Sequence, residues 1–518
     1  MSLGTHYVIG LEAMNCVTGG SFAREQREAR NKEEVLTELG KAASSLRGKL
    51  GESLASIQKF DTPIEDATTT SLEALRLYTE GLKQNRAGNF RQGLLLAERA
   101  TETDPNFASA YGLLATTHRN LGQVPASLEY SAKAYALRDR VSGPEKMRIT
   151  GIYHSYRGDV TKTIETYEVS KQMYPHNYNA HSLANEYAAV GRYADALTEY
   201  QEAIRQNPNS ALSQTNLALV YSALNRFEEA QAVVKKAMER KLESIDMHRL
   251  LYAIAFIRGD RETMQREVDW AKGRPDESNM IFIQVQAAAS SGKVGEARKL
   301  LNQAVDMEQR GGRREVAAGY RSFFALIEAL FGNDRQARAQ SEEALRISPI
   351  LTSVEFAVPA LGFAGNHQAI RTLIGEAKKE HPQDTFMNSI FIPTALAALE
   401  IRSGNGAKAI ELLNAAKSYE PGPVGIYATY TRATAYLQTK SGREAAAEFQ
   451  KILEHHGAFP FIYPALSQLG LARAYTLTGD LPNARKCLQV FLASWKDADP
   501  DIPILVQAKR EYAKLASN

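Results

Sequence analysis

The stretch Ala184–Pro208, ANEYAAVGRYADALTEYQEAIRQNP, decides the fold of this chain. Its alanines and tyrosines recur at helical spacing on both sides of Gly191, which predicts two helices joined by a short turn. Glycine tolerates the positive φ that ends a helix, and Pro208 disfavours helix at the residue before it. The small side chains let the two helices approach closely. The stretch is therefore a helical hairpin with one apolar face.

The same pattern returns along most of the 518 residues. The turn positions Gly158, Gly191 and Asn225 are 33 and 34 residues apart. Because such a hairpin cannot bury its apolar face alone, neighbouring copies must stack into a continuous array. The pattern predicts about twelve hairpins, with turns at Gly88, Gly122, Gly158, Gly191, Asn225, Gly259, Gly292, Gly332, Gly365, Gly404, Lys440 or Gly442, and Gly479. The wider spacing of 40 residues between Gly292 and Gly332 predicts a longer loop at Arg310-Gly311-Gly312-Arg313-Arg314.

The N-terminal residues follow a different pattern. Residues 6–14 read as a strand, and Thr18-Gly19-Gly20 supplies the turn into a second strand that ends near Arg27. A helix capped by Asn31 follows. Since a hairpin and one helix bury little surface, we expect a C-terminal fragment of an α/β domain. The expected boundaries are 1–60 for this fragment, 61–71 for a polar linker, 72–498 for the array and 499–518 for a capping helix.

The repeated pattern resembles tetratricopeptide repeat proteins over roughly residues 71–518. The resemblance implies an all-α solenoid, or superhelix, of about twelve helical hairpins. It also implies a scaffold that binds a protein or peptide, with no catalytic residues and no cofactor. In such a superhelix the first helix of each hairpin lines a concave groove.

Three further segments carry a narrower resemblance: Tyr7–Ala13, Lys49–Ala55 and Trp495–Leu505. They look like the C-terminal region of bacterial serine/threonine protein kinases that carry repeat arrays. The resemblance implies a cytoplasmic kinase, a membrane helix, an α/β domain and then the repeats, which would place this region on the extracytoplasmic, periplasmic side. A similar layout follows bacterial winged-helix transcriptional regulators, which leaves a cytoplasmic ligand-binding region as the alternative.

This chain departs from the kinase pattern in its motifs. It has no Gly-rich ATP loop, no His-Arg-Asp catalytic loop and no Asp-Phe-Gly metal motif. We therefore expect no enzyme activity. We also expect a truncated product that keeps only the end of the α/β domain.

Composition excludes several classes of partner. The net charge is +3, from 62 Lys and Arg against 59 Asp and Glu, so no strong field attracts nucleic acid. No apolar run is long enough to insert into a membrane. Cys16 and Cys487 lie far apart in the sequence and match no metal or disulfide pattern. Adjacent histidines on a helix point in different directions, so His455-His456 predicts a helix end and no metal site.

The groove that the resemblance implies supplies the candidate partner-binding residues. Asn185 and Asn216 could bond a peptide backbone, while Arg148 and Arg249 could attract carboxylates. A structural role for these polar residues is the alternative. The full candidate set is Arg148, Ile152, Tyr156, Tyr178, His181, Asn185, Thr215, Asn216, Leu219 and Arg249.

Chaperone-binding relatives clamp a terminal carboxylate with two asparagines flanked by basic residues. Asn185 and Asn216 match the two asparagines. His181, Asp246 and Leu250 stand where basic residues are expected, so the clamp is incomplete. Two other hypotheses stay open: a small ligand held within the superhelix, and self-association through the exposed strand edge of the N-terminal hairpin.

Overall fold

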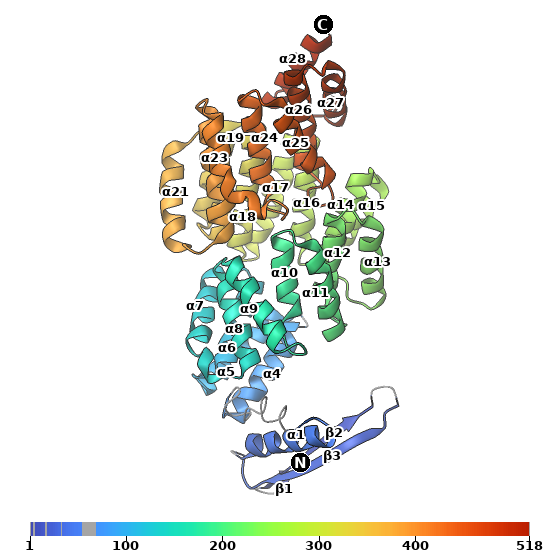
Figure 1. Cartoon of the computed structure of the whole chain (residues 1–518), viewed down its shortest axis with the longest axis vertical. Helices are drawn as coiled ribbons and strands as arrows, with labels where there is room; N and C mark the ends of the chain where they lie inside the picture. The colour runs from blue at the N-terminus through green and yellow to red at the C-terminus, as the bar shows by residue number, and fades with distance from the viewer. Residues whose placement is uncertain are drawn as a thin grey trace. The chain divides into compact units, whose positions relative to one another are not determined.

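The computed structural model describes residues 2–3, 6–15, 18–32, 34–53, 69–86 and 88–516. Cys16 and most of the predicted linker lie outside these residues. From Leu72 onward the chain is built of helical hairpins (Figure 1). They fall into two compact units, the first ending at Arg157 and including Glu165–Tyr178, and the second formed by Gly158–Ile164 and Asn179–Asn518.

The N-terminal residues form the expected hairpin, with one more strand. The antiparallel strands β1 (Ser2–Leu3), β2 (His6–Met14) and β3 (Ser21–Ala29) pair in the order β1-β2-β3. The sequence did not predict β1, because two residues carry no alternating pattern. Helix α1 (Val35–Lys49) packs against β2 and β3. Just before it, the Asn31 side chain accepts a hydrogen bond from the Glu34 amide.

Helices α4 to α27 form the successive hairpins, so the predicted all-α repeat fold is confirmed. The helices of the first unit are α4 (Leu72–Arg86), α5 (Phe90–Thr103), α6 (Ala108–Asn120), α7 (Val124–Ala136), the short 3₁₀ helix η1 (Arg138–Arg140) and α8 (Gly143–Tyr156). Helix α9 (Val160–Met173) begins in the second unit and ends in the first. The second unit continues with α10 (Ala180–Ala189), α11 (Tyr193–Gln206), α12 (Ala211–Ala223), α13 (Phe227–Glu239), α14 (Ile245–Arg258), α15 (Arg261–Ala271), α16 (Glu277–Ser290), α17 (Val294–Arg310), α18 (Arg314–Leu330) and α19 (Asp334–Ile347). It ends with α20 (Leu351–Phe363), α21 (His367–Glu380), η2 (Met387–Phe391), α22 (Ile392–Arg402), α23 (Gly406–Leu412), η3 (Leu413–Tyr419), α24 (Ile426–Gln438), α25 (Gly442–Glu454), α26 (Ile462–Thr478), α27 (Leu481–Ser494) and α28 (Pro503–Ala516).

The predicted turn residues have the backbone conformation that the helix ends require. Each predicted glycine turn, from Gly88 to Gly479, has positive φ, and so does Asn225. Of the two alternatives near residue 440, Lys440 takes the turn with φ 58°. Gly442 instead begins α25, where a Cβ would come 2.8 Å from the Ala474 carbonyl oxygen. This glycine is therefore needed for close helix packing.

The prediction of a longer loop at Arg310–Arg314 is wrong. Helix α17 continues to Arg310 and α18 starts at Arg314, so the extra residues lengthen two helices. Arg313 Nη2 donates to the fully buried Glu308 carboxylate at 2.9 Å. Arg314 Nη2 donates to the Ile347 carbonyl oxygen at 2.9 Å. The two arginines thus have structural partners in neighbouring helices.

An aromatic core occupies the space between the first helices of the later hairpins. Phe282 of α16 stacks on Tyr320 of α18 with ring centroids 3.9 Å apart. Phe356 of α20 contacts Tyr427 of α24, two hairpins further on, at 5.9 Å. Because rings from alternate hairpins meet, this part of the array buries its inner face against itself and forms one large core. The first helices from α16 to α26 are therefore packed closely against one another.

Turns of early hairpins also contact loops of much later hairpins within the second unit. The Thr385 amide donates to the Gly158 carbonyl oxygen at 2.8 Å, and the Asp499 amide donates to the Gly292 carbonyl oxygen at 3.1 Å. Between these contacts, Asn225 Nδ2 donates to the Glu454 carbonyl oxygen at 2.6 Å. A superhelix brings such distant segments together when its windings touch. Later loops therefore cover the inner face of earlier hairpins.

Candidate binding site

A cavity of about 560 Å³ lies between the first helices α10, α12, α14 and α16 of the second unit. Polar side chains from α10 to α14 line one side of the cavity. Mostly apolar residues from the loop before α26 lie over the opposite side and are called the cover. The polar wall comprises Asn185, Tyr200, Asn216, Asp246 and Arg249, and the cover comprises Gly457, Ala458, Pro460 and Phe461 together with Pro423. Leu219, Leu250, Ala253 and Ile283 add apolar wall.

Four of the predicted groove residues meet in this cavity. Asn185, Asn216, Leu219 and Arg249 all line it, because each stands on the inner face of a first helix. Thr215 does not line it. Its side chain is 3% exposed and donates to the Ala211 carbonyl oxygen at 2.9 Å, so it serves helix packing.

The sequence did not reveal the cover or several wall residues. Gly457–Phe461 and Pro423 belong to hairpins more than 200 residues away from α10. Tyr193 and Tyr200 belong to α11, the second helix of its hairpin, which the groove prediction left out. No local signal in the sequence predicts contact between windings. The signal that the sequence offered for Tyr193 and Tyr200 was that they belong to the same predicted hairpin as the groove residue Asn185.

A chain of hydrogen bonds holds the polar wall in place. Asn185 Oδ1 accepts from the Tyr200 hydroxyl at 2.6 Å and from Asn216 Nδ2 at 2.9 Å. Asn185 Nδ2 lies 3.3 Å from His181 Nε2, and His181 Nδ1 lies 3.0 Å from Ser213 Oγ. Because the amide can only donate, Nε2 is the accepting nitrogen and Nδ1 carries the proton. The asparagine side chains are therefore fixed before any ligand arrives.

Charge in the cavity is nearly balanced. Burial lowers the pKa of His181 to about 4, so its imidazole is neutral at physiological pH. Arg249 Nη1 donates to Asp246 Oδ1 at 2.7 Å, which offsets its positive charge. Arg249 Nε is buried without a hydrogen-bond partner. Among the described residues that line the cavity, Arg249 is the basic one, and its pairing with Asp246 leaves it poorly suited to clamp a carboxylate.

The burial of His181 leads us to expect that the stability of the protein depends on pH. Folding lowers the pKa of His181 from 6.5 to about 4. The stabilising contribution of the neutral ring is therefore complete above pH 6.5 and is lost as the pH falls toward 4. We expect the melting temperature of the unchanged protein to fall more over this range than that of His181→Gln, which does not titrate. Parallel melting curves of the two proteins would contradict the prediction.

The remaining predicted residues belong to the first unit. Arg148 is half-buried, and its Nη2 has no hydrogen-bond partner. Burial raises the pKa of Tyr156, and the Arg119 guanidinium lies 5.5 Å from its ring centroid. Ile152 and Tyr178 are each 9% exposed. A partner-binding role for these residues stays a prediction.

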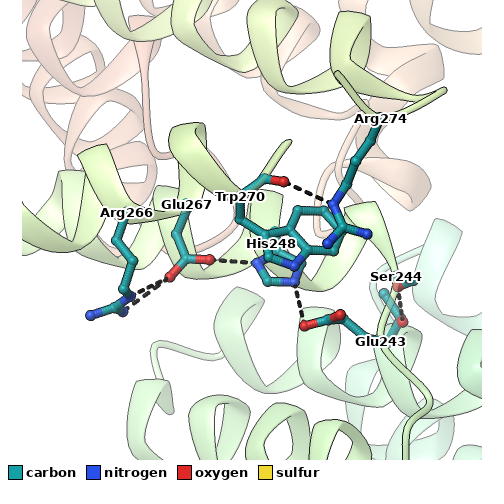
Figure 2. A network of polar contacts seen from close by, with 8 residues as sticks. Glu243, Ser244, His248, Arg266, Glu267, Trp270 and Arg274 are labelled. Atoms are coloured by element: carbon teal, nitrogen blue, oxygen red, sulfur yellow. Dashed lines mark hydrogen bonds and ion pairs between the residues drawn. The ribbon is translucent and has the colours of Figure 1, made fainter. Parts of the chain in front are cut away.

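A second polar cluster surrounds His248 on α14 (Figure 2). His248 is 4% exposed, with Nδ1 2.5 Å from Glu267 Oε2 and Nε2 3.1 Å from Glu243 Oε1. Its ring stacks on Trp270 at 3.4 Å, and the Arg274 guanidinium lies 3.9 Å from the same indole ring. Both imidazole nitrogens have carboxylate partners, and little of the ring reaches solvent. The cluster therefore joins α14 to α15 and has the features of a structural network.

We expect His248→Gln to lower the free energy of unfolding by about 1–2 kcal/mol, because it loses the ring stack and one carboxylate contact. Urea unfolding monitored by circular dichroism measures the change. Replacement of Glu243, whose side chain is 40% exposed, should have a smaller effect. Equal effects of the two substitutions would be inconsistent with this network.

The His455-His456 pair lies at the end of a helix, as the sequence predicted. His455 follows the last residue of α25, and His456 Nδ1 lies 3.2 Å from the Leu453 carbonyl oxygen. Within the described part of the chain, no group of three His, Cys, Asp or Glu side chains is placed to hold a metal ion. No described helix combines the length and apolar character that crossing a membrane requires.

Comparison with known proteins identifies the repeats. Two family models, both described as tetratricopeptide repeat, match residues 187–254 and 107–145. The first match covers much of the cavity wall. These two stretches are therefore similar to tetratricopeptide repeats, in agreement with the hairpins observed there. No curated protein matches the chain.

The solved structures that match the chain share little sequence with it. The crystal structure of yeast Tom70 is 15% identical over 86% of this chain and 96% of that chain, with a TM-score of 0.32. The Naa15/Naa10 complex bound to HypK-THB matches at 14% identity, 85% and 65% coverage, and a TM-score of 0.22. The APC/C hetero-tetramer Cut9-Hcn1 matches at 13% identity, 85% and 96% coverage, and a TM-score of 0.31.

Proposed function

We propose that this tetratricopeptide repeat chain is a non-catalytic scaffold that binds a protein by taking a peptide segment into the cavity between α10, α12, α14 and α16. Tetratricopeptide repeats generally mediate protein–protein interaction. The observation that carries the proposal is the meeting of Asn185, Asn216, Leu219 and Arg249 around one cavity of about 560 Å³. Cavities of about 300–1,000 Å³ enclose ligands well.

The exposure of Leu219 supports the same site. Its side chain is 43% exposed although it lines the cavity, so it offers apolar surface that a partner can cover. Leu212 stands on the same helix and is 59% exposed, but it does not line the cavity. The two leucines therefore form a matched pair for mutation.

The test compares Leu219→Asp with Leu212→Asp as bait in cell extracts of the source organism, with partners quantified by mass spectrometry. A charge at position 219 should reduce specific partners by about tenfold or more, since burying an unpaired charge is strongly unfavourable. The change at position 212 should leave them unaffected. Equal capture by both variants would remove the cavity as the binding site, and melting curves would show that both variants are folded.

We further propose that the scaffold serves signalling, as the sensing or assembly region of a bacterial receptor-type serine/threonine protein kinase. The support is the resemblance of Tyr7–Ala13, Lys49–Ala55 and Trp495–Leu505 to such kinases. Sequencing the reading frame that encodes Met1 and its upstream region tests this attachment. A kinase and a membrane helix are expected there, whereas an upstream winged helix would replace this proposal with the regulator alternative.

A small ligand is the second candidate for the cavity. The cover from Gly457 to Phe461 narrows the groove into a pocket, which suits a compact ligand as well as a peptide. A ligand that binds the native state alone raises the melting temperature. Thermal shift against a metabolite library, with Leu219→Asp as control, tests this candidate. The absence of any shift that depends on Leu219 would count against it.

A further inference from the structure

We propose that the cavity selects an uncharged, apolar peptide segment, with its side chains against the Gly457–Phe461 cover and its main chain toward Asn216 and Arg249. This inference rests on the proposed function and names the chemistry of the segment. It differs from an acidic tail, which the asparagine pair alone would favour.

The charges around the cavity argue against a charged segment. Of the described residues that line it, Asp246 and Arg249 are the charged ones, and they bond each other at 2.7 Å. A carboxylate that approached Arg249 would meet the negative charge of Asp246 as well. A lysine that approached Asp246 would meet the positive charge of Arg249. Since the paired charges cancel, neither sign gains much on entering, while both lose hydration.

The apolar surface argues for an apolar segment. The cover contributes Ala458, Pro460 and Phe461, and the walls contribute Leu219 and Ile283. Leu219 remains 43% exposed, whereas Leu217 on the same helix is 6% exposed. Large apolar surface inside a concave site is the usual feature of ligand recognition. Apolar side chains entering the cavity would cover Leu219 and displace water from the cover.

The polar wall is suited to a peptide main chain. An asparagine amide offers two N–H donors and a carbonyl oxygen, and the Asn216 side chain donates to Asn185 Oδ1 and also has a hydrogen bond with Tyr200, which leaves its carbonyl oxygen as an acceptor. It therefore retains capacity for a main-chain bond. Arg249 also lines the cavity, and its guanidinium carries several N–H donors of which Nη1 bonds Asp246. A peptide carbonyl oxygen is neutral and would accept from this guanidinium without adding charge.

Disulfide exchange at a single introduced cysteine tests the selectivity. Leu219→Cys places the thiol at the cavity, and Leu212→Cys on the same helix is the matched control; both are made with Cys16→Ser and Cys487→Ser. The probes are acetylated, amidated peptides Cys-Leu-Leu-Gly, Cys-Glu-Glu-Gly and Cys-Lys-Lys-Gly, each supplied as its mixed disulfide with 2-mercaptoethanol. The protein thiolate attacks the peptide sulfur, forms the protein–peptide disulfide and releases 2-mercaptoethanol. Intact mass measures the conjugated fraction as free 2-mercaptoethanol is raised.

At Leu219→Cys, half of the Leu-Leu conjugate should survive at a concentration of 2-mercaptoethanol about tenfold higher than for the Glu-Glu or Lys-Lys conjugates. A tenfold difference corresponds to a modest binding free energy. At Leu212→Cys, the three conjugates should agree within about twofold. Equal resistance at position 219, or preference for Glu-Glu, would overturn the inference. A fourth probe, 2-phenylethanethiol, identifies a small-molecule site if it is retained and no peptide is.

The two proposals fail separately. If Leu-Leu is preferred but Leu219→Asp and Leu212→Asp capture the same partners, the cavity is selective for apolar segments and does not serve the scaffold. If Leu219→Asp loses partners but the peptides show no preference, binding at the cavity holds and its apolar selectivity is wrong.

Discussion

Replacing Arg432 with methionine is expected to lower the free energy of unfolding by about 3–5 kcal/mol, the range for removing one member of a buried ion cluster. Arg432 is 3% exposed on α24. Its Nη1 donates to Glu420 Oε1 at 2.5 Å and its Nη2 to Glu448 Oε2 at 2.9 Å. Glu420 directly follows η3 and Glu448 lies on α25, so the Arg432 guanidinium on α24 joins three segments. Methionine would fill much of the volume and leave both carboxylates without their main partner.

The charge state of Glu448 gives this prediction a pH dependence. Burial acts to raise the pKa of Glu448, but hydrogen bonds from Arg432 and Lys451 outweigh it and lower the pKa below 4.5. In the unchanged protein this contribution to stability is present above pH 4.5 and is lost as the pH falls below it. In Arg432→Met the carboxylates gain from protonation. The difference in stability between the two proteins should therefore shrink in acid.

Hydrogen exchange over α24 and α25 is the sharpest measurement, because repeat arrays open locally. Arg432→Met should increase exchange in these helices far more than in α12. The variant that adds Glu420→Gln and Glu448→Gln should recover at least half of the loss, since no charge is then buried alone. If the triple variant is as unstable as Arg432→Met, lost packing rather than unpaired charge is responsible.

Local signals in the sequence were enough to predict the hairpins. Gly191 and Asn225 end helices whatever surrounds them, since the conformation they adopt depends on their own backbone. The repeat period then placed Asn185 and Asn216 on equivalent faces of successive first helices, and both line the cavity. The predicted loop at Arg310–Arg314 failed because spacing alone cannot distinguish a longer loop from longer helices.

The cover of the cavity could not be predicted, because it depends on how far the superhelix rises in one winding. Asn225 illustrates the difference between a local feature, which the sequence predicts, and a contact between windings, which it does not. Its positive φ was expected from the repeat, whereas its side-chain bonds to Glu454 and Gly457 were not. Small changes in the angle between hairpins, summed over several repeats, decide which loop meets this turn. The sequence carries no short-range signal of that sum.

The contact between the cover and α12 leads to the second large prediction. Gly457→Ala is expected to lower the free energy of unfolding by about 2–3 kcal/mol, as overpacked sites do. A Cβ at Gly457 would lie 2.0 Å from the Ser222 carbonyl oxygen and 2.7 Å from Asn225 Oδ1. The first of these is main chain, so the side chain cannot simply rotate away. The segment has to move off α12 and weaken the bonds from the Gly457 amide to Asn225 Oδ1 at 2.8 Å and from Ser222 Oγ to the Gly457 carbonyl oxygen at 3.2 Å.

Gly375→Ala is the matched control for this substitution. Gly375 lies within α21, and an added Cβ there would meet nothing within 4 Å. Because alanine favours helix, this control should be neutral or stabilising by about 0.5–1 kcal/mol. Gly457→Ala should also speed exchange of the amides in 454–461 and 222–227, and should make a thiol at Leu219→Cys react faster with iodoacetamide. A Gly457→Ala protein that matches Gly375→Ala in both stability and exchange would show that the later winding does not close the cavity in solution. The cavity would then be an open groove, and the selectivity assigned to its cover would have no structural basis.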